Sequence, residues 1–296
     1  MATANASSGA GRGVELGIAI MPDARAPERA VKLAVLADAV GLDLIGIQDH
    51  PYKPQFLDTW SLLCYIGART RRIRVVPDVA NLPLRPPAML AKAAASLDLL
   101  TGGRVELGLG AGAFWEEIAS MGGPSRAKGE SVDALAEAIE VIRAVWSGEQ
   151  VVNVAGERYR LEGLHPGPPP AHPIGIWVGA FGPRMLQLTG RLADAWLPSF
   201  PPLRHNEVAA CQAAIDRAAS ESGRDPAEIR RAANVADPGK PVTGWAGKLA
   251  RTAETLRFDT FFVAAGDAET VRRLGEDVAP RLRELTQGMG PARPRR

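Results

Sequence analysis

The sequence predicts an α/β protein, a (β/α)₈ TIM barrel with an insertion between its fourth and fifth strands. Short apolar runs alternate with longer helical runs along nearly the whole chain, which is typical of parallel βα units. Eight such pairs occur, and 296 residues suit one barrel of about 250 residues with an insertion. An open doubly wound sheet is the runner-up, but the count of eight and the unbroken alternation favour the barrel.

The eight expected strands are short, and the third continues through Pro77-Asp78-Val79-Ala80-Asn81. They cover residues 14–20, 42–47, 73–76, 104–109, 173–179, 193–197, 229–235 and 259–264. Helices fill the intervals. Pro27 opens the first, where a missing N–H costs nothing, and Gly41 ends it. The expected helices cover residues 27–40, 57–68, 87–100, 132–146, 184–191, 206–222, 243–256 and 268–285.

The insertion starts after the fourth strand. Ala113–Gly129 is expected to be a long loop, which in a compact domain is usually a functional lid or a disordered segment. Apolar residues spaced by 3, 4, 3 and 4 from Val132 to Trp146 predict an amphipathic helix. A small hairpin is expected over 151–161, followed by an irregular proline-rich stretch over 164–173.

Composition narrows the class of protein. A net charge of +2 gives no reason to expect a nucleic-acid partner, and the lack of about 18 consecutive apolar residues argues against a membrane span. Cys64 and Cys211 show no metal-like spacing, so no metal site is expected and a reducing cytoplasm fits. Residues 1–13 and 287–296 are expected to be disordered tails on a single domain of residues 14–286.

The stretch Thr101-Gly-Gly-Arg-Val-Glu-Leu-Gly-Leu-Gly-Ala-Gly112 organises the rest of the chain. Gly102 and Gly103 end a helix, a buried strand follows, and glycines then recur at every second position. Glycines at the carboxyl end of a strand allow a close approach to the backbone. We therefore expect a ligand at this end of the barrel.

Several segments, in order along nearly the whole chain, resemble the bacterial luciferase-like superfamily of flavin- or deazaflavin-dependent oxidoreductases. They are Ala37-Asp-Ala-Val-Gly-Leu-Asp43, Asp49-His50, Leu82-Pro-Leu-Arg-Pro-Pro-Ala88, Ala93–Gly112, Gly179-Ala-Phe-Gly-Pro-Arg184, Gly190-Arg-Leu-Ala-Asp-Ala-Trp196 and Val278-Ala-Pro-Arg-Leu-Arg283. The resemblance implies a homodimeric TIM barrel that binds coenzyme F-420 or FMN at the carboxyl face of its strands. Members transfer hydride to or from small organic substrates, or activate oxygen as monooxygenases.

The resemblance also indicates which residues bind the cofactor. The turn before the helix at Pro183 would hold the phosphate on backbone N–H groups at the helix N-terminus. Related deazaflavin enzymes carry a non-proline cis peptide, which supports the ring, at the place of Asp78-Val79. A plain βα turn and an ordinary strand end are the alternatives. The candidates are Asp78, Val79, Gly110, Ala111, Gly112, Gly179, Ala180, Phe181, Gly182, Pro183 and Arg184.

Asp49 and His50, at the end of the second strand, are the candidate catalytic residues. Histidine can move a proton or stabilise charge near neutral pH, and Asp49 can orient it or contact the polar edge of the ring. The alternative is a loop pair that caps the turn before Pro51. We favour function because His50 lies on the catalytic face of the barrel.

Some deazaflavin relatives place a glutamate directly after the glycine series, where this chain has Ala113, Phe114 and Trp115. The departure disfavours glutamate-assisted chemistry on a sugar phosphate and favours a more apolar pocket. Packing of the two aromatic rings on the barrel rim is the alternative.

These expectations together describe a cytoplasmic oxidoreductase that transfers hydride between bound coenzyme F-420 and a small organic substrate. FMN is the alternative cofactor, and an FMN-dependent monooxygenase with a separate flavin reductase is the alternative activity. A non-catalytic flavin-binding protein on the same fold is the alternative from another class. Stoichiometric cofactor binding without turnover would identify it.

Overall fold

The computed structural model describes residues 13–198, 205–236 and 244–288. Apart from Gly13, Gln287 and Gly288, the two predicted tails lie outside the described residues. The start of the helix predicted over 243–256 also falls just inside an undescribed segment, which covers 237–243. Within the described ranges, no helix is long and apolar enough to cross a membrane.

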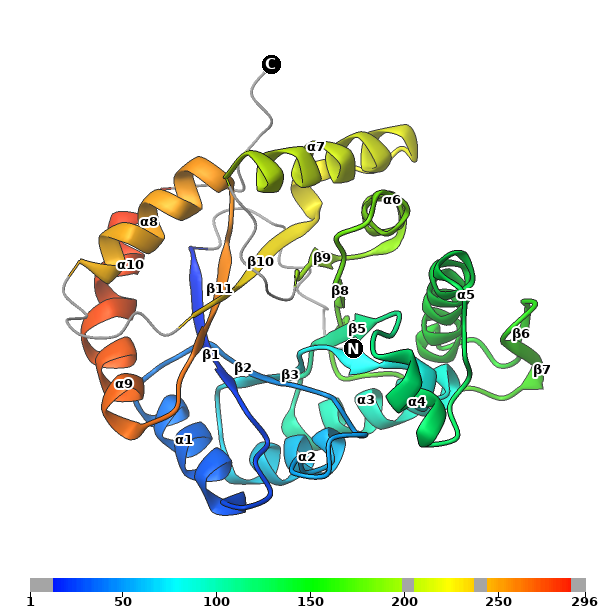
Figure 1. Cartoon of the computed structure of the whole chain (residues 1–296), viewed down its shortest axis with the longest axis horizontal. Coiled ribbons are helices and arrows are strands. Elements are labelled where there is room, and N and C mark those ends of the chain that lie inside the picture. The colour runs from blue at the N-terminus through cyan, green and yellow to red at the C-terminus, as the bar shows by residue number, and fades with distance from the viewer. Residues whose placement is uncertain (1–12, 199–204, 237–243, 289–296) are drawn as a thin grey trace, which may run out of the picture.

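Parallel strands form one sheet that curves into a barrel (Figure 1). In sheet order they are β3 (Arg74–Pro77), β2 (Leu44–Ile47), β1 (Glu15–Ile20), β11 (Thr260–Ala264), β10 (Arg230–Val235), β9 (Ala195–Trp196), β8 (Ile176–Val178), β5 (Leu107–Gly110) and β4 (Ala80–Asn81). A parallel bridge between Val75 in β3 and Val105, just before β5, closes the barrel. β3 and β4 together form the predicted third strand, so the barrel has the eight predicted strands. The predicted α/β barrel is therefore confirmed.

Helices surround the barrel, with the longer ones packed against the outside of the strands (Figure 1). Their bounds are α1 (Pro27–Ala39), α2 (Thr59–Arg69), α3 (Pro87–Thr101), α4 (Trp115–Ser120), α5 (Lys128–Trp146), α6 (Pro183–Leu192), α7 (His205–Glu221), α8 (Trp245–Leu256), α9 (Ala268–Arg273) and α10 (Ala279–Leu285). The helix predicted over 268–285 is divided, because a π-helical turn over Leu274–Val278 separates α9 from α10. Short 3₁₀ turns cover Leu82–Leu84 and Pro226–Glu228.

The insertion contains one element that the sequence reasoning missed. Ala113–Gly129 was predicted to be entirely loop, but it contains α4, and its last two residues already belong to α5. The six residues of α4 bury only Ile118, so the segment carries no apolar periodicity that reveals a helix. The predicted hairpin is confirmed as β6 (Val152–Ala155) and β7 (Arg160–Leu164), which pair antiparallel and lie beyond α5 (Figure 1).

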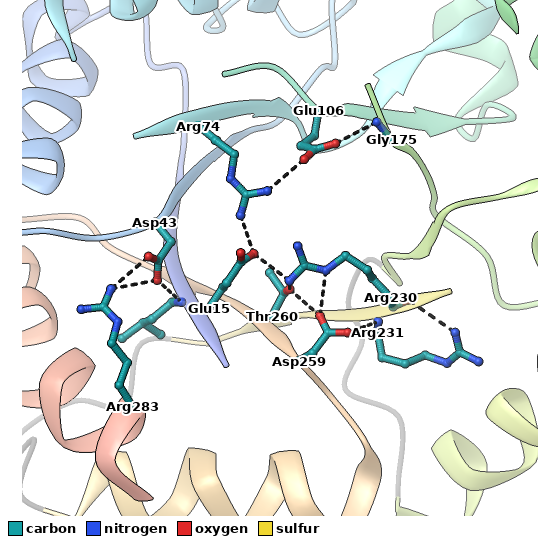
Figure 2. A network of polar contacts seen from close by, with 11 residues as sticks. Glu15, Asp43, Arg74, Glu106, Gly175, Arg230, Arg231, Asp259, Thr260 and Arg283 are labelled. Atoms are coloured by element: carbon teal, nitrogen blue, oxygen red, sulfur yellow. Dashed lines mark hydrogen bonds and ion pairs between the residues drawn. The ribbon is translucent and has the colours of Figure 1, made fainter. Parts of the chain in front are cut away.

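Charged side chains close the amino end of the barrel (Figure 2). Glu15, at the start of β1, pairs with Arg74 and also with Arg230, the latter at 2.7 Å. Arg74 also contacts Glu106 at 2.9 Å, and Arg230 contacts Asp259 at 3.2 Å. Burial alone would raise the pKa of Glu15, but Arg230 and Arg74 outweigh it and hold that pKa below its usual value. The network joins the starts of five strands, β1, β3, β5, β10 and β11, at the end of the barrel opposite the carboxyl ends of the strands.

Above this charged layer, apolar side chains fill the barrel. Trp177 and Phe262 meet edge to face, with ring centroids 6.2 Å apart. The buried cluster consists of Leu44, Val76, Trp177, Ala195, Leu197, Ala232 and Phe262, with Ala19 and Val79 packed against it. Val79 therefore lies between the packed interior and the carboxyl face, where its side chain would contact a bound ligand from below.

Candidate active site

A cavity of about 1160 Å³ lies at the carboxyl ends of the strands. It exceeds the roughly 300–1,000 Å³ of common small-molecule sites, so it has room for a cofactor together with a substrate. Most predicted site residues line it: Asp49, His50, Asp78, Val79, Gly110, Ala111, Gly112, Gly179, Phe181, Gly182, Pro183 and Arg184. Ala180 is not among the lining residues. It is buried, and its carbonyl accepts a 2.9 Å hydrogen bond from Trp196.

The Asp78-Val79 peptide bond at the exit of β3 is cis, as the resemblance implied. The Val79 side chain lies against the glycine series. A Cβ on Gly110 would stand 2.7 Å from Val79 Cγ2, and one on Gly108 would stand 2.0 Å from the Pro77 carbonyl oxygen. The glycines therefore make room first for the neighbouring strand exit. Gly110 and Gly112 also line the cavity themselves, whereas Gly108 does not, so direct contact between a ligand and the last glycines of the series stays a prediction.

Asp78 is buried beside the cavity and faces Asn234 on β10. Asn234 Nδ2 donates a 3.2 Å hydrogen bond to Asp78 Oδ1. Burial, only partly offset by this hydrogen bond, raises the pKa of Asp78 to about 6. Gly46 leaves space for the carboxyl group, because a Cβ there would stand 3.1 Å from Asp78 Oδ2. Sequence reasoning missed Asn234, although an amide next to the carboxyl end of a barrel strand was a usable signal.

Asp49 is almost completely buried and bound to protein groups. Arg85 donates two hydrogen bonds of 2.7 Å to its two carboxylate oxygens, and the backbone N–H of Asn81 donates another of 2.8 Å. Arg85 also donates to Asp58, the N-cap of α2, at 2.7 Å. Sequence reasoning missed Arg85. These contacts hold the end of β2 in place, so Asp49 serves the site by fixing the backbone of His50.

His50 sits in an aromatic group at the cavity wall. Its Nδ1 lies 2.7 Å from the Tyr52 hydroxyl oxygen, and its ring meets Phe114 edge to face at 5.7 Å. Burial, with a smaller effect from Lys53, lowers the pKa of His50, while Asp49 opposes the shift. The imidazole is therefore held neutral at neutral pH. Sequence reasoning did not single out Tyr52.

Two helix N-termini meet at one part of the cavity wall. Gly182 is the N-cap of α6, and Gly129 and Ser131 in the first turn of α5 also line the cavity. Arg184 connects the two helices, donating a 2.8 Å hydrogen bond to Asp133. Backbone N–H groups of first turns carry partial positive charge, so this corner suits an anionic group such as a phosphate.

Residues 113–115, where this chain differs from the deazaflavin relatives that carry a glutamate, line the cavity with apolar side chains. Ala113, Phe114 and Trp115 are lining residues, whereas Glu116 and Glu117 are not. Phe114 has φ of +47°, an uncommon backbone conformation for a residue other than glycine. Arg126 donates a 2.9 Å hydrogen bond to the Tyr159 hydroxyl. The predicted apolar character of this wall is therefore present among the described residues.

Sequence comparison identifies the family to which this chain belongs. The chain belongs to the luciferase-like monooxygenase family, whose sequence model matches residues 7–236. Among curated relatives, the F420-dependent hydroxymycolic acid dehydrogenase of Mycobacterium tuberculosis is 32% identical over 273 residues, which is 90% of this chain and 73% of that protein.

A second relative is the F420-dependent glucose-6-phosphate dehydrogenase of Gordonia bronchialis, 32% identical over 180 residues, 58% of this chain and 52% of that protein. The chain matches only part of several other curated relatives, between 47% and 64% of their length. A solved F420-dependent secondary alcohol dehydrogenase with an F420-acetone adduct superposes with a TM-score of 0.78 at 18% identity. The match covers 91% of this chain and 99% of that one, and it supports the fold.

Proposed function

We propose that this protein is an oxidoreductase that binds coenzyme F-420 and transfers hydride between it and a small organic substrate. The observation that carries the proposal is one cavity lined by the first turns of α5 and α6, by Val79 and by His50. The names of the two relatives above support the choice of deazaflavin over FMN.

The residues fit such a cofactor. The first turn of α6 and Arg184 suit its phosphate, and the smooth apolar floor formed by Val79 suits one face of a planar ring. Asn81 and Asn234 line the cavity, and each keeps a buried side-chain oxygen without a hydrogen-bond partner. When bound, a deazaflavin supplies the carbon centre that accepts or donates hydride.

The surrounding side chains would orient the reactants and exclude water. Val79 would support the ring from below, while Phe114 and Trp115 would cover the substrate with apolar surface. His50 would contact the reacting oxygen of the substrate as a neutral hydrogen-bonding group. Because the glutamate of sugar-phosphate relatives is absent, we expect an uncharged, apolar substrate.

The cofactor can be tested directly. Purified protein is titrated with coenzyme F-420 and with FMN, and binding is followed by fluorescence and calorimetry. We expect saturable F-420 binding that weakens in the Arg184→Gln variant. Tight FMN binding with no response to F-420 would overturn the proposed cofactor and favour the monooxygenase with a separate flavin reductase.

A second experiment tests catalysis. His50→Ala should retain cofactor binding and lose turnover by about 10²-fold or more, the scale of a positioned acid, base or hydrogen-bond donor. Unchanged turnover would rule out the role of His50. Cofactor binding with no turnover on aldehydes, alcohols or enones would favour the non-catalytic alternative. A homodimer stays a prediction, which sedimentation of the purified protein checks.

A further inference from the structure

Tyr52 Oη and His50 Nδ1 lie 2.7 Å apart, so one of the two atoms donates a hydrogen bond to the other. Within the described part of the chain, the Tyr52 hydroxyl has no other hydrogen-bond acceptor. Donation by Tyr52 gives its hydroxyl hydrogen a protein acceptor, whereas donation by Nδ1 would leave that hydrogen to the cavity that Tyr52 lines. This pairing favours Tyr52 as the donor and Nδ1 as the acceptor.

This direction determines where the imidazole carries its proton. A neutral imidazole has one N–H, and because Nδ1 accepts, that N–H is at Nε2. Nε2 has no protein hydrogen-bond partner among the described residues, and His50 lines the cavity. The Nε2–H group is thus left for a ligand. Asp49 does not compete for it, because Arg85 and Asn81 occupy the Asp49 carboxylate.

We infer that Tyr52 is a positioning residue that holds His50 as an Nε2–H donor, so that the site receives the oxygen of a carbonyl substrate. The inference rests on the proposed function and narrows its substrates to ketones, aldehydes or enones and the corresponding alcohols. In the reverse direction the same Nε2–H group would stabilise the alkoxide of the alcohol, because a reaction and its reverse share one transition state.

The charges around the pair maintain this state. Lys53 disfavours a second proton on His50, and burial acts in the same direction, while Asp49 opposes them. Burial, Glu117 and Asp49 raise the pKa of Tyr52 to about 12, which keeps its hydroxyl protonated as a donor. Near neutral pH both groups are uncharged, so the hydrogen-bond direction is stable.

The step balances without another redox partner. The substrate carbon would receive a hydride, two electrons and one proton, which a bound reduced deazaflavin would supply as it is oxidised. The carbonyl π bond would break toward oxygen, and the Nε2–H group of His50 would stabilise the negative charge that develops there. The oxygen would then take a proton from water, which yields the alcohol and a hydroxide ion that the solvent buffer neutralises.

The tautomer can be measured without cofactor. Wild-type protein labelled with ¹⁵N-histidine is examined by long-range ¹H–¹⁵N correlation at pH 8, and His50→Gln identifies the His50 signals. We expect Nε2 to be protonated and Nδ1 bare in the wild type, with both tautomers present in Tyr52→Phe. Tyr65→Phe, on an exposed face of α2, is the matched control and should leave the signals unchanged. A protonated Nδ1, or identical signals in Tyr52→Phe, would overturn the inference.

A kinetic arm tests the substrate class. With reduced coenzyme F-420 and a panel of ketones, aldehydes and enones, Tyr52→Phe should lower kcat roughly tenfold while cofactor binding is unchanged. No turnover of any carbonyl compound in the panel, with cofactor bound, overturns the carbonyl assignment. Failure to bind either cofactor overturns the proposed function instead, and the tautomer measurement still decides the role of Tyr52.

Discussion

Arg85 donates two 2.7 Å hydrogen bonds to Asp49, and this pair connects the end of β2 to the turn before α3. The Asp49 side chain is 1% exposed and that of Arg85 is 17% exposed, so water screens the interaction poorly. Arg85 also reaches Asp58, whose side chain is 45% exposed. Arg85 therefore pairs with one buried and one exposed carboxylate, and the contributions of the two ion pairs to stability can be compared.

Asp49→Asn should lower the free energy of unfolding by about 3 kcal/mol, because a buried arginine loses its charged partner. Asp58→Asn should change it by less than about 1 kcal/mol, because the lost ion pair is exposed and asparagine still caps α2. Urea denaturation of both variants at pH 7 provides the measurement. Equal losses in the two variants would contradict a special role for the buried pair.

Asp78 should make the protein less stable as pH rises. Its folded pKa of about 6 lies above its ordinary value of 3.8, so between about pH 4 and pH 6 the folded state binds more protons than the unfolded state. The free energy of unfolding therefore falls by roughly 3 kcal/mol across this window.

Asp78→Asn removes this titration while keeping a polar group beside Asn234. The variant should exceed the wild type in stability above pH 6 and match it near pH 4. Paired urea denaturations at pH 4, 5, 6 and 8 measure the difference. A constant difference at every pH would show that Asp78 does not titrate in this window.

Glu15→Gln should cost about 3 kcal/mol at pH 7, because Arg74 and Arg230 lose their shared carboxylate at the closed end of the barrel. The folded pKa of Glu15 lies below its usual value. Its stabilising effect is therefore complete above the unfolded pKa and is lost as pH falls through the folded one.

The control is Glu28→Gln, which removes an exposed pair with Lys32 on α1 and should have no measurable effect. Chemical denaturation measures stability, and F-420 titration measures binding. Because Glu15 lies at the end opposite the cavity, its variant should bind cofactor normally once folded. Weakened binding in folded Glu15→Gln would show that the two ends are coupled.

Gly108→Ala should destabilise the barrel by about 3 kcal/mol, since the new Cβ would stand 2.0 Å from the Pro77 carbonyl oxygen and β3 or β5 would have to shift. Gly182→Ala is the matched control, because its Cβ would meet nothing within 4 Å and its φ is −75°. Thermal unfolding compares them. If both behaved alike, close strand packing would not explain the glycine at position 108.

Much of the fold was predictable because helix-start and helix-stop residues and the spacing of apolar residues indicate its elements locally. Pro27 and Gly41 mark the ends of the first helix region, and the 3, 4, 3 and 4 spacing from Val132 to Trp146 matches α5. The short helix α4 was not predictable, because six residues with one buried side chain show no helical periodicity of apolar residues.

Most of the candidate site was also predictable, because residues at carboxyl ends of parallel strands gather on one face of a barrel. That rule brought Asp49, His50, Asp78 and Gly179 to one cavity. It did not say how they pair. Arg85 is 36 residues from Asp49, and Asn234 is 156 residues from Asp78.

The sequence by itself determined the alternation of strands and helices, the glycine-rich strand exit and the apolar segment after it. Only the tertiary structure decided that Asp49 is bound by Arg85, that Gly108 and Gly110 make room for Pro77 and Val79, and that Tyr52 is hydrogen-bonded to His50. The physical reason is the distance along the chain over which each kind of interaction acts. Strand and helix propensities act over a few residues, whereas burial, ion pairing and close backbone approach depend on which strand exits become neighbours when the barrel closes.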